Sequence, residues 1–322
     1  MKKSIPVLMA VWLLWGAGPS EAQRIYRIGA LVGNDQFVPA IEGFKKRMAE
    51  LGYQEGKNIK YDVYNARGER DLIGQMAQKL VRDKPDLIVT SSTTATTPVA
   101  KLTEGSGIPV VFLSAGNPLV FVKSYSSSGN NLTGISSSEI DLTEKRMELL
   151  KELAPGIKKV ISLNNPKSEN YEANLKATRE AAKKLGLGLA EINVTSREEV
   201  LKQAKGLLTR KLGDGIMHPP DAIISAAIRE ITPEINKEKL PSVAVNIGSV
   251  KAGALITYAA DFFALGQRGA ALVDKILKGT KPSDLPIEQP YKLKLVVNLK
   301  TAKTIGLKIP KEILLRADEV IE

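Results

Sequence analysis

The first half of this chain is echoed by the second at a spacing of 132 to 135 residues. Each half contains an amphipathic helix that ends in glycine, then a short apolar strand, then another strand that follows a helical segment. A repeat of this length whose helices and strands keep their order predicts two lobes of similar fold. The paired segments are 39–52 with 173–186, 86–91 with 221–226, and 108–112 with 240–244.

Continuous apolar strands alternate with amphipathic helices in both halves. Parallel strands need a crossover of a dozen or more residues, and helices then cover both faces of the sheet, so its strands are apolar throughout. We therefore predict an α/β fold of two lobes, each a doubly wound parallel sheet. The predicted strands lie near 25–32, 58–63, 86–90 and 109–113 in the first lobe, and near 158–163, 188–193, 221–225 and 242–246 in the second.

The chain is expected to cross between the lobes three times. The crossings are predicted near Gly134, at Gly253–Tyr258 before a helix over 261–278, and after the proline-rich stretch 282–290. Two independent Rossmann-like domains in tandem are the alternative, but the long segment after the second repeat must pack somewhere. The predicted N-terminal lobe comprises 23–134 with 259–287, and the C-terminal lobe comprises 135–258 with 288–322.

The N-terminus is typical of an exported protein. Lys2 and Lys3 precede an uncharged, largely apolar run over 5–18, and the small-residue pattern at 20–22 predicts a signal peptide, residues 1–22, cleaved after Ala22. A retained membrane anchor is the alternative, but this run is shorter than the ~20 apolar residues that span a bilayer. Because the chain has no cysteine to carry a thioether-linked lipid, we expect a soluble protein of a Gram-negative periplasm.

The chain carries a net charge of +11 at pH 7, which raises the question of nucleic acid. Its lysines are spread along amphipathic segments such as 45–47, 158–159 and 183–184, with glutamates between them. No nucleic-acid-binding motif accompanies them. We interpret these lysines as solvated helix faces and expect no nucleic-acid partner.

Doubly wound sheets also host enzymes such as dehydrogenases and hydrolases. The chain lacks a Gly-x-Gly-x-x-Gly turn, a Gly-x-x-x-x-Gly-Lys-Ser/Thr loop and a Gly-x-Ser-x-Gly elbow. Its single histidine, His218, is predicted in a loop before a strand, at the edge away from the ligand. Without clustered His and Cys ligands we expect no metal, and we expect no cofactor or catalytic residue.

In an open parallel sheet, ligands bind beyond the carboxyl ends of the strands. The Ser/Thr run 91–97 lies where a predicted strand becomes a helix, so hydroxyls and free N–H groups meet at the positive end of the helix dipole. We expect a carboxylate or other anion there; helix capping is the alternative and accounts for one or two of the hydroxyls. The candidate ligand-binding residues are Asn34, Asp35, Ser91, Ser92, Thr93, Thr94, Ser114 and Asn117 in the first lobe, Asn164, Ser168, Asn170, Ala226 and Asn246 in the second, and Asp261.

Short segments along essentially the whole mature chain together resemble the tryptophan/tyrosine-type ABC transporter substrate-binding proteins. They are 42–44 (EGF), 84–89 (KPDLIV), 108–112 (IPVVF), 131–134 (NLTG), 153–155 (LAP), 253–255 (GAL) with Tyr258 and Asp261, and 298–303 (NLKTAK) through 316–319 (RADE). The resemblance implies a periplasmic binding protein of type I-like fold. It also implies delivery of a small-molecule ligand from the cleft to an ABC permease in the inner membrane with its cytoplasmic ATPase.

The resemblance also implies roles for single residues. Ser91, Thr93 and Thr94 would receive a ligand carboxylate, Asn117 and Asn164 would hydrogen-bond across the cleft, and Asp261 would face an ammonium group. Two positions depart from the family. Asn34-Asp35 stands where many relatives have a histidine, and Ala226-Ala227 stands where they have an acidic residue after the third strand of the second lobe. These departures favour a ligand that is less cationic than those of relatives.

The predicted function is therefore ligand capture for import. We expect a monomer that binds a small polar ligand, carboxylate-bearing or amino-acid-like, by closure of the lobes around the crossing strands. A periplasmic sensor that presents its closed form to a membrane receptor has the same sequence features, so import and sensing both stay open.

Overall fold

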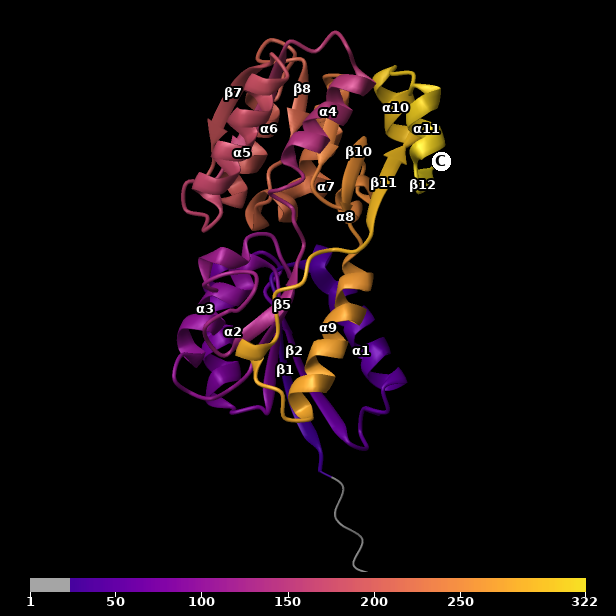
Figure 1. The fold of residues 1–322 in the computed structure, drawn as a ribbon. Coiled ribbons are helices and arrows are strands. Elements are labelled where there is room, and N and C mark those ends of the chain that lie inside the picture. Colours follow the sequence, from indigo (N-terminus) through magenta and orange to yellow (C-terminus); the bar gives the residue numbers. More distant parts are fainter. Residues whose placement is uncertain (1–23) are drawn as a thin grey trace, which may run out of the picture.

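The structure of the protein is a computed structural model that describes residues 24–322. The predicted signal peptide lies outside the described residues. The chain forms two lobes, one above the other in Figure 1, and three segments pass between them. In the described range, no helix is long and apolar enough to cross a membrane.

The first lobe is built on a five-stranded parallel sheet with the order β2-β1-β3-β4-β5. Helices α1 and α9 pack on one face around one apolar cluster, and α2 and α3 cover the other. Its elements are β1 (Tyr26–Val32), α1 (Val38–Glu50), β2 (Ile59–Asn65), α2 (Arg70–Arg82), β3 (Leu87–Ser91), α3 (Thr93–Thr103), β4 (Val110–Ala115), β5 (Leu132–Ser136) and α9 (Phe262–Leu277).

The second lobe contains a seven-stranded sheet with the order β12-β11-β10-β9-β8-β6-β7. Strands β6 to β10 are parallel, whereas β11 runs antiparallel to β10, and β12 pairs in parallel with β11. Helices α4, α5, α10 and α11 cover one face, and α6 and α7 cover the other. The elements are α4 (Thr143–Leu153), β6 (Lys159–Asn164), α5 (Tyr171–Lys184), β7 (Gly188–Asn193), α6 (Arg197–Gly206), β8 (Gly215–Met217), α7 (Ala222–Lys237), β9 (Ser242–Ala244), α8 (Ile247–Lys251), β10 (Ile256–Ala260), β11 (Leu293–Asn298), α10 (Leu299–Ile305), α11 (Lys311–Arg316) and β12 (Glu319–Ile321).

The predicted two-lobed α/β fold is confirmed, and the repeat appears as two sheets wound in the same order, β2-β1-β3-β4-β5 and β7-β6-β8-β9-β10. One predicted strand is wrong. Residues 221–225 are not a strand, because Asp221 caps α7 and the following residues form its first turns. The third strand of this lobe is β8, which has only three residues. A short apolar run fits a buried strand or a helix start equally well, so periodicity could not separate them.

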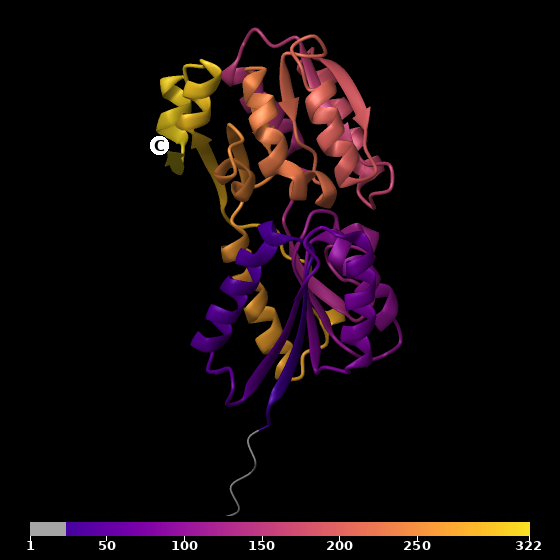
Figure 2. The same ribbon diagram turned by 180° about the vertical axis from the view of Figure 1, so that it is seen from behind.

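The three crossing segments lie side by side between the lobes (Figures 1 and 2). The chain crosses after β5, after β10 and before β11. The third crossing pairs with the first, since Ser136 N donates to the Glu288 carbonyl at 2.8 Å and Glu288 N to the Gly134 carbonyl at 2.9 Å. It pairs with the second through the β10–β11 ladder. We propose these crossings as the lobe boundaries, for which the sequence suggested 134, 258 and 287.

Arg146 of α4 fastens two of these crossings to the second lobe. Its side chain is fully buried and donates to three backbone carbonyls, those of Glu139 at 2.6 Å, Tyr258 at 3.0 Å and Val245 at 3.1 Å. Glu139 follows the first crossing and Tyr258 precedes the second. One guanidinium therefore fixes the backbone beside two of the three crossings.

Helices α1 and α9 approach each other closely at two glycines. A Cβ on Gly266 would lie 1.8 Å from the Ala40 carbonyl oxygen, and one on Gly43 would lie 2.0 Å from that of Phe263. Glycine is the residue that permits such contact between two backbones. Because α9 follows the second lobe in sequence, this contact anchors the returning chain in the first lobe.

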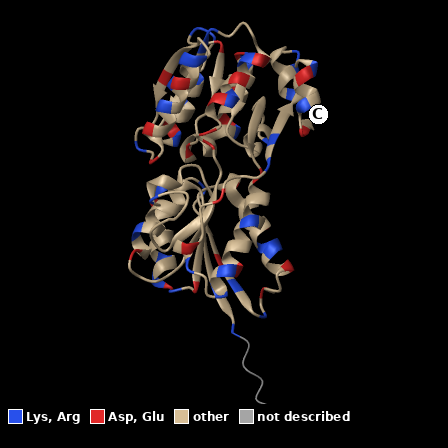
Figure 3. Ribbon diagram, viewed as in Figure 1, with Lys and Arg blue, Asp and Glu red and all other residues tan. Residues whose placement is uncertain are grey.

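Charged residues of both signs cover both lobes. Figure 3 shows Lys and Arg interspersed with Asp and Glu on the outer helices. Many form exposed pairs within or between helices, such as Lys184 with Glu144. Each such pair contributes little to stability.

Candidate ligand-binding cleft

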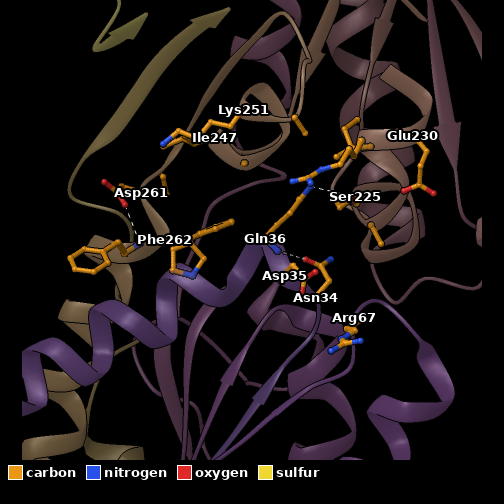
Figure 4. Close-up of a pocket in the computed structure, with 18 of the residues that line it drawn as sticks. Asn34, Asp35, Gln36, Arg67, Ser225, Glu230, Ile247, Lys251, Asp261 and Phe262 are labelled. Atoms are coloured by element: carbon orange, nitrogen blue, oxygen red, sulfur yellow. Dashed lines mark hydrogen bonds between the residues drawn. The ribbon is translucent and has the colours of Figure 1, made fainter. Parts of the chain in front are cut away.

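The carboxyl ends of strands in one lobe face those of the other. Between them is an open cleft of about 770 Å³, lined from the first lobe by residues 34–36 after β1 and from the second by α7 and α8. Figure 4 shows Asn34, Asp35 and Gln36 facing Ser225 and the α8 residue Ile247. The cleft therefore lies where a doubly wound fold is expected to bind a ligand.

Gln36 is the main polar bridge across this cleft. Its Nε2 donates to the Ser225 carbonyl at 2.8 Å, and its Oε1 accepts from Asn246 Nδ2 at 2.7 Å. Asn34 adds a longer bond, from Nδ2 to the Ala222 carbonyl at 3.4 Å. Asp35 instead accepts from Asn65 of its own lobe at 2.7 Å. Gln36 was missing from the predicted site, although it directly follows Asn34-Asp35.

A second set of contacts joins the lobes beside α2 and α3. Arg70 Nη1 donates to the Lys167 carbonyl at 2.7 Å, and Nη2 pairs with Glu169 at 2.5 Å. Nearby, a small cavity of about 10 Å³ is lined by Thr94 from α3 and by Ser168 of the second lobe. The structure thus brings these two predicted residues to one interlobe cavity.

Residues of the Ser/Thr run cap α3 and bond to the loop after β4. Ser92 Oγ caps α3 by accepting from Ala95 N at 3.1 Å, and Thr93 Oγ1 accepts from Asn117 N at 3.1 Å. Ser91 and Ser114 bond to each other at 2.9 Å inside the lobe. The N–H groups of the first turn, at Thr93 and Thr94, have no carbonyl of their own helix to bond. If the predicted anion binds at this end of α3, backbone N–H groups would therefore receive it more than hydroxyls.

Ser92 adopts an unusual backbone conformation at this point. Its φ is +98°, a region that side chains rarely adopt. Gly33 makes room for it, because a Cβ there would lie 2.4 Å from Ser92 Oγ. Strain of this kind costs of order 1–3 kcal/mol and is concentrated at functional sites.

Polar side chains at the strand ends of the second lobe are buried. Asn164 exchanges hydrogen bonds with Ser162 of its own strand, at 3.3 and 3.5 Å, so its predicted bond across the cleft is not observed. Asn170 is 6 % exposed, and its Oδ1 has no hydrogen-bond partner within residues 24–322. Unpaired polar atoms at such depth are costly and need a partner.

His218 lies elsewhere than predicted. It directly follows β8, so it stands at the carboxyl end of that strand, on the edge that faces the first lobe. The side chain is 2 % exposed, and neither ring nitrogen has a hydrogen-bond partner in the described chain. Burial lowers the pKa of His218 to about 4. The error follows from the misassigned strand at 221–225.

The same misassignment affects Ala226 and the acidic residue thought to be missing. Ala226 lies in the second turn of α7, not after a strand, and lines the cleft. The residues that follow the third strand are 218–221, and they end in Asp221. Burial raises the pKa of Asp221, against hydrogen bonds from Ile224, Asn165, Ser168 and Ile223 that lower it. An acidic residue is therefore present in this part of the second lobe.

Asp261 faces an ammonium group, but one that belongs to the protein. Its Oδ2 accepts from Lys294 Nζ at 2.6 Å, while its Oδ1 caps α9 by accepting from Phe263 and Ala264 N. Burial raises the pKa of Asp261, but Lys294 and the cap outweigh it and the net shift is downward. Asp261 lines the cleft and also joins the second and third crossings through Lys294, and its role in ligand binding stays a prediction.

Glu139 is a second residue that sequence reasoning missed. It lies between β5 and α4, is 7 % exposed, and its carboxylate rests against Gly116 of the first lobe. Burial raises its pKa to about 6, and the attraction of Arg146 opposes that rise. The only signal in the sequence is a lone acid after three serines at a predicted crossing.

Two doubly wound lobes, three crossing segments and polar strand ends that face each other define the type I-like periplasmic binding protein fold. The model of the family described as "ABC transporter substrate binding protein" matches residues 27–321. The chain belongs to this family.

Similar proteins agree with this assignment. A tyrosine-binding protein from Clostridioides difficile is 29% identical over 290 residues, 89% of this chain and 82% of its own length. A conserved domain protein from Vibrio cholerae is 25% identical with a TM-score of 0.86, covering 92% of this chain and 100% of its own. An ABC domain from Streptococcus pneumoniae in complex with L-Trp is 26% identical with a TM-score of 0.84 and the same two coverages. The first of these relatives is named for tyrosine binding, the third contains L-Trp, and the description of the second states no function.

Proposed function

We propose that this chain is the periplasmic substrate-binding protein of an ABC importer and that it clamps an aromatic amino acid between its lobes. The observation that carries the proposal is the placement of polar strand ends from both lobes on the two sides of one cleft. In this arrangement, ligand contacts from the two lobes exist together only when the lobes are closed. A ligand then shifts an existing equilibrium toward the closed form.

The lobe arrangement supports closure as the binding motion. The structure superposes on the L-Trp complex with a TM-score of 0.84, but on a ligand-free, open substrate-binding protein from Clostridium difficile with only 0.66. Sequence identity is 26% and 25%, and 92% of this chain is covered in both comparisons. The difference therefore reflects lobe orientation more than divergence. The bonds of Gln36 and Arg70 to the second lobe fit a closed form.

The ligand class is inferred from the relatives and from the site. One relative is named for tyrosine binding and another contains L-Trp. The N-terminus of α3 offers N–H groups for a carboxylate. Asp221 is an acidic residue after the third strand of the second lobe, so one of the two reasons to expect a less cationic ligand no longer holds.

Export and transport complete the proposal. We propose that residues 1–22 are removed as a signal peptide and that the monomer acts in the periplasm, where it delivers its ligand to a permease with a cytoplasmic ATPase. Deletion of the gene is expected to abolish uptake of the ligand. If uptake persists and a membrane receptor binds the liganded protein, the function is sensing.

A ligand screen of residues 23–322 tests the binding function. We expect L-tryptophan or L-tyrosine to raise the unfolding midpoint in a concentration-dependent way, as any ligand of the native state does. Neutral sugars such as ribose serve as controls. If no amino acid stabilises the protein or binds in calorimetry, the proposal is wrong.

A further inference from the structure

Glu139 is a buried carboxylate in the wall between the lobes. Its backbone carbonyl is held by Arg146 of the second lobe at 2.6 Å. Its side chain reaches the first lobe, since a Cβ on Gly116 would lie 2.8 Å from Glu139 Oε2. Gly116 follows β4, at the carboxyl edge of the sheet. The carboxylate therefore lies at the junction of both lobes and the first crossing.

Most other carboxylates around the cleft are already engaged, and Glu69, which also lines it, is exposed to solvent. Asp261 binds Lys294 and caps α9. Asp221 caps α7 and accepts from Asn165 Nδ2 at 3.0 Å. At the open mouth, Glu230 pairs with Arg197 and Glu319 with Lys251.

Glu139 differs from these acids. All three hydrogen bonds of the neighbouring Arg146 guanidinium go to backbone carbonyls. Among residues 24–322, Glu139 forms no salt bridge. Its burial is opposed only by the attraction of the fully buried Arg146 guanidinium and by the Ser137 hydroxyl. An ammonium group from outside the chain would add a direct ion pair to this buried carboxylate.

The surroundings of Glu139 specify the kind of cation. The residue after Gly116 is Asn117, whose N–H donates to Thr93 Oγ1 at the start of α3. The acid and the anion-binding end of α3 thus meet at the same two-residue loop. An α-amino acid carries its ammonium and its carboxylate on one carbon, which suits two sites of opposite charge at one loop.

We propose that Glu139 binds the ammonium group of an amino-acid ligand whose carboxylate lies at the N-terminus of α3. This inference rests on the proposed function. Arg146 acts as a positioning residue because it holds the Glu139 backbone. The carboxylate selects for ligands that carry an α-amino group.

The test compares ligands with and without the amino group. Calorimetry of the mature protein and Glu139→Gln would use L-tryptophan and L-tyrosine beside 3-(indol-3-yl)propionate and 3-(4-hydroxyphenyl)propionate. We expect Glu139→Gln to weaken binding of the amino acids by about 10- to 100-fold, the range for loss of a charge-assisted hydrogen bond. Binding of the two propionates should change by less than about 3-fold. Glu148→Gln, on the exposed face of α4, is the matched control and should bind like wild type.

The outcomes separate this inference from the proposed function. If wild type binds none of the amino acids, the proposed function fails. If wild type binds them and Glu139→Gln binds them equally well, or loses all four ligands alike while its unfolding midpoint is unchanged, the role of Glu139 is refuted. Should Glu139→Gln fold poorly, Glu139→Asp retains the charge on a shorter chain and is expected to weaken amino acids more than propionates. Equal weakening of both classes would count against the inference.

Discussion

Replacing Gly266 by alanine is expected to destabilise the protein by separating α9 from α1. The new Cβ would lie 1.8 Å from the Ala40 carbonyl oxygen and 2.9 Å from Phe44 N. Both neighbours are helix backbone, so no side chain can rotate away. Because carbon and oxygen do not approach below about 3 Å, the helices must part by roughly 1 Å in a close-packed core.

The expected magnitude follows from two opposing effects. Alanine is favoured over glycine within a helix by about 0.5–1 kcal/mol. Overpacking of a core costs about 1–3 kcal/mol, and more where backbone must move. We therefore expect Gly266→Ala to lower the free energy of unfolding by about 2 kcal/mol or more.

Gly74→Ala is the matched control for this prediction. Gly74 lies within α2, and no atom lies within 4 Å of where its Cβ would be. This variant should gain about 0.5–1 kcal/mol, because only helix propensity changes. Urea unfolding followed by circular dichroism measures both variants. A Gly266→Ala protein as stable as wild type, or more stable, would refute the packing argument.

Three further predictions concern the cleft and the hinge. Gln36→Ala removes three interlobe hydrogen bonds, one of them long at 3.4 Å. Their loss, together about 2 kcal/mol, should weaken ligand binding about 30-fold, and X-ray scattering should show a larger radius of gyration for the free protein. Unchanged affinity and size would contradict this. His218→Phe removes a group whose pKa is lowered from 6.5 to about 4 in the folded protein. As pH falls from 7 to 4, the unfolded chain binds this proton first, so wild type should lose about 3 kcal/mol of unfolding free energy relative to the variant. Parallel pH profiles of stability for the two proteins would refute this. Lys294→Met should raise the pKa of Asp261 in an NMR titration, since Lys294 is a main cause of its lowered value. The contribution of this pair to wild-type stability is present above the ordinary pKa of aspartate and is lost as pH falls through the lowered pKa of Asp261.

The fold was predictable because its signals are repeated. Each long apolar strand is bounded by turn residues, and α1 (Val38–Glu50) carries its apolar stripe through Ile41, Phe44 and Met48. The repeat placed most equivalent elements in both halves without reference to contacts, but its pairing of 86–91 with 221–226 matched a strand with the start of α7. The weak point was β8, whose three residues are too few to show a pattern, while the start of α7 has an apolar run that suits either structure.

The site was predictable as a location and less so as a set of roles. The rule that ligands lie at carboxyl ends of strands located Asn34 and Asp35 at the interlobe cleft and Thr94 at the small interlobe cavity. It could not show that Lys294, 33 residues away in sequence, forms an ion pair with Asp261. Nor could it distinguish Glu139 from a surface acid, because its burial depends on Gly116 and Arg146. Such roles depend on partners that are distant in sequence.

The position of α9 also sets an order for folding. The first lobe cannot complete its core until residues 262–277 are available, and by then every strand of the second lobe up to β10 has been synthesised. A chain that emerges N-terminus first would therefore bury most of the second lobe while the α1 face of the first lobe is still uncovered. That face, with Ala40 and Phe44, is the surface most in need of protection from aggregation until the chain is nearly complete.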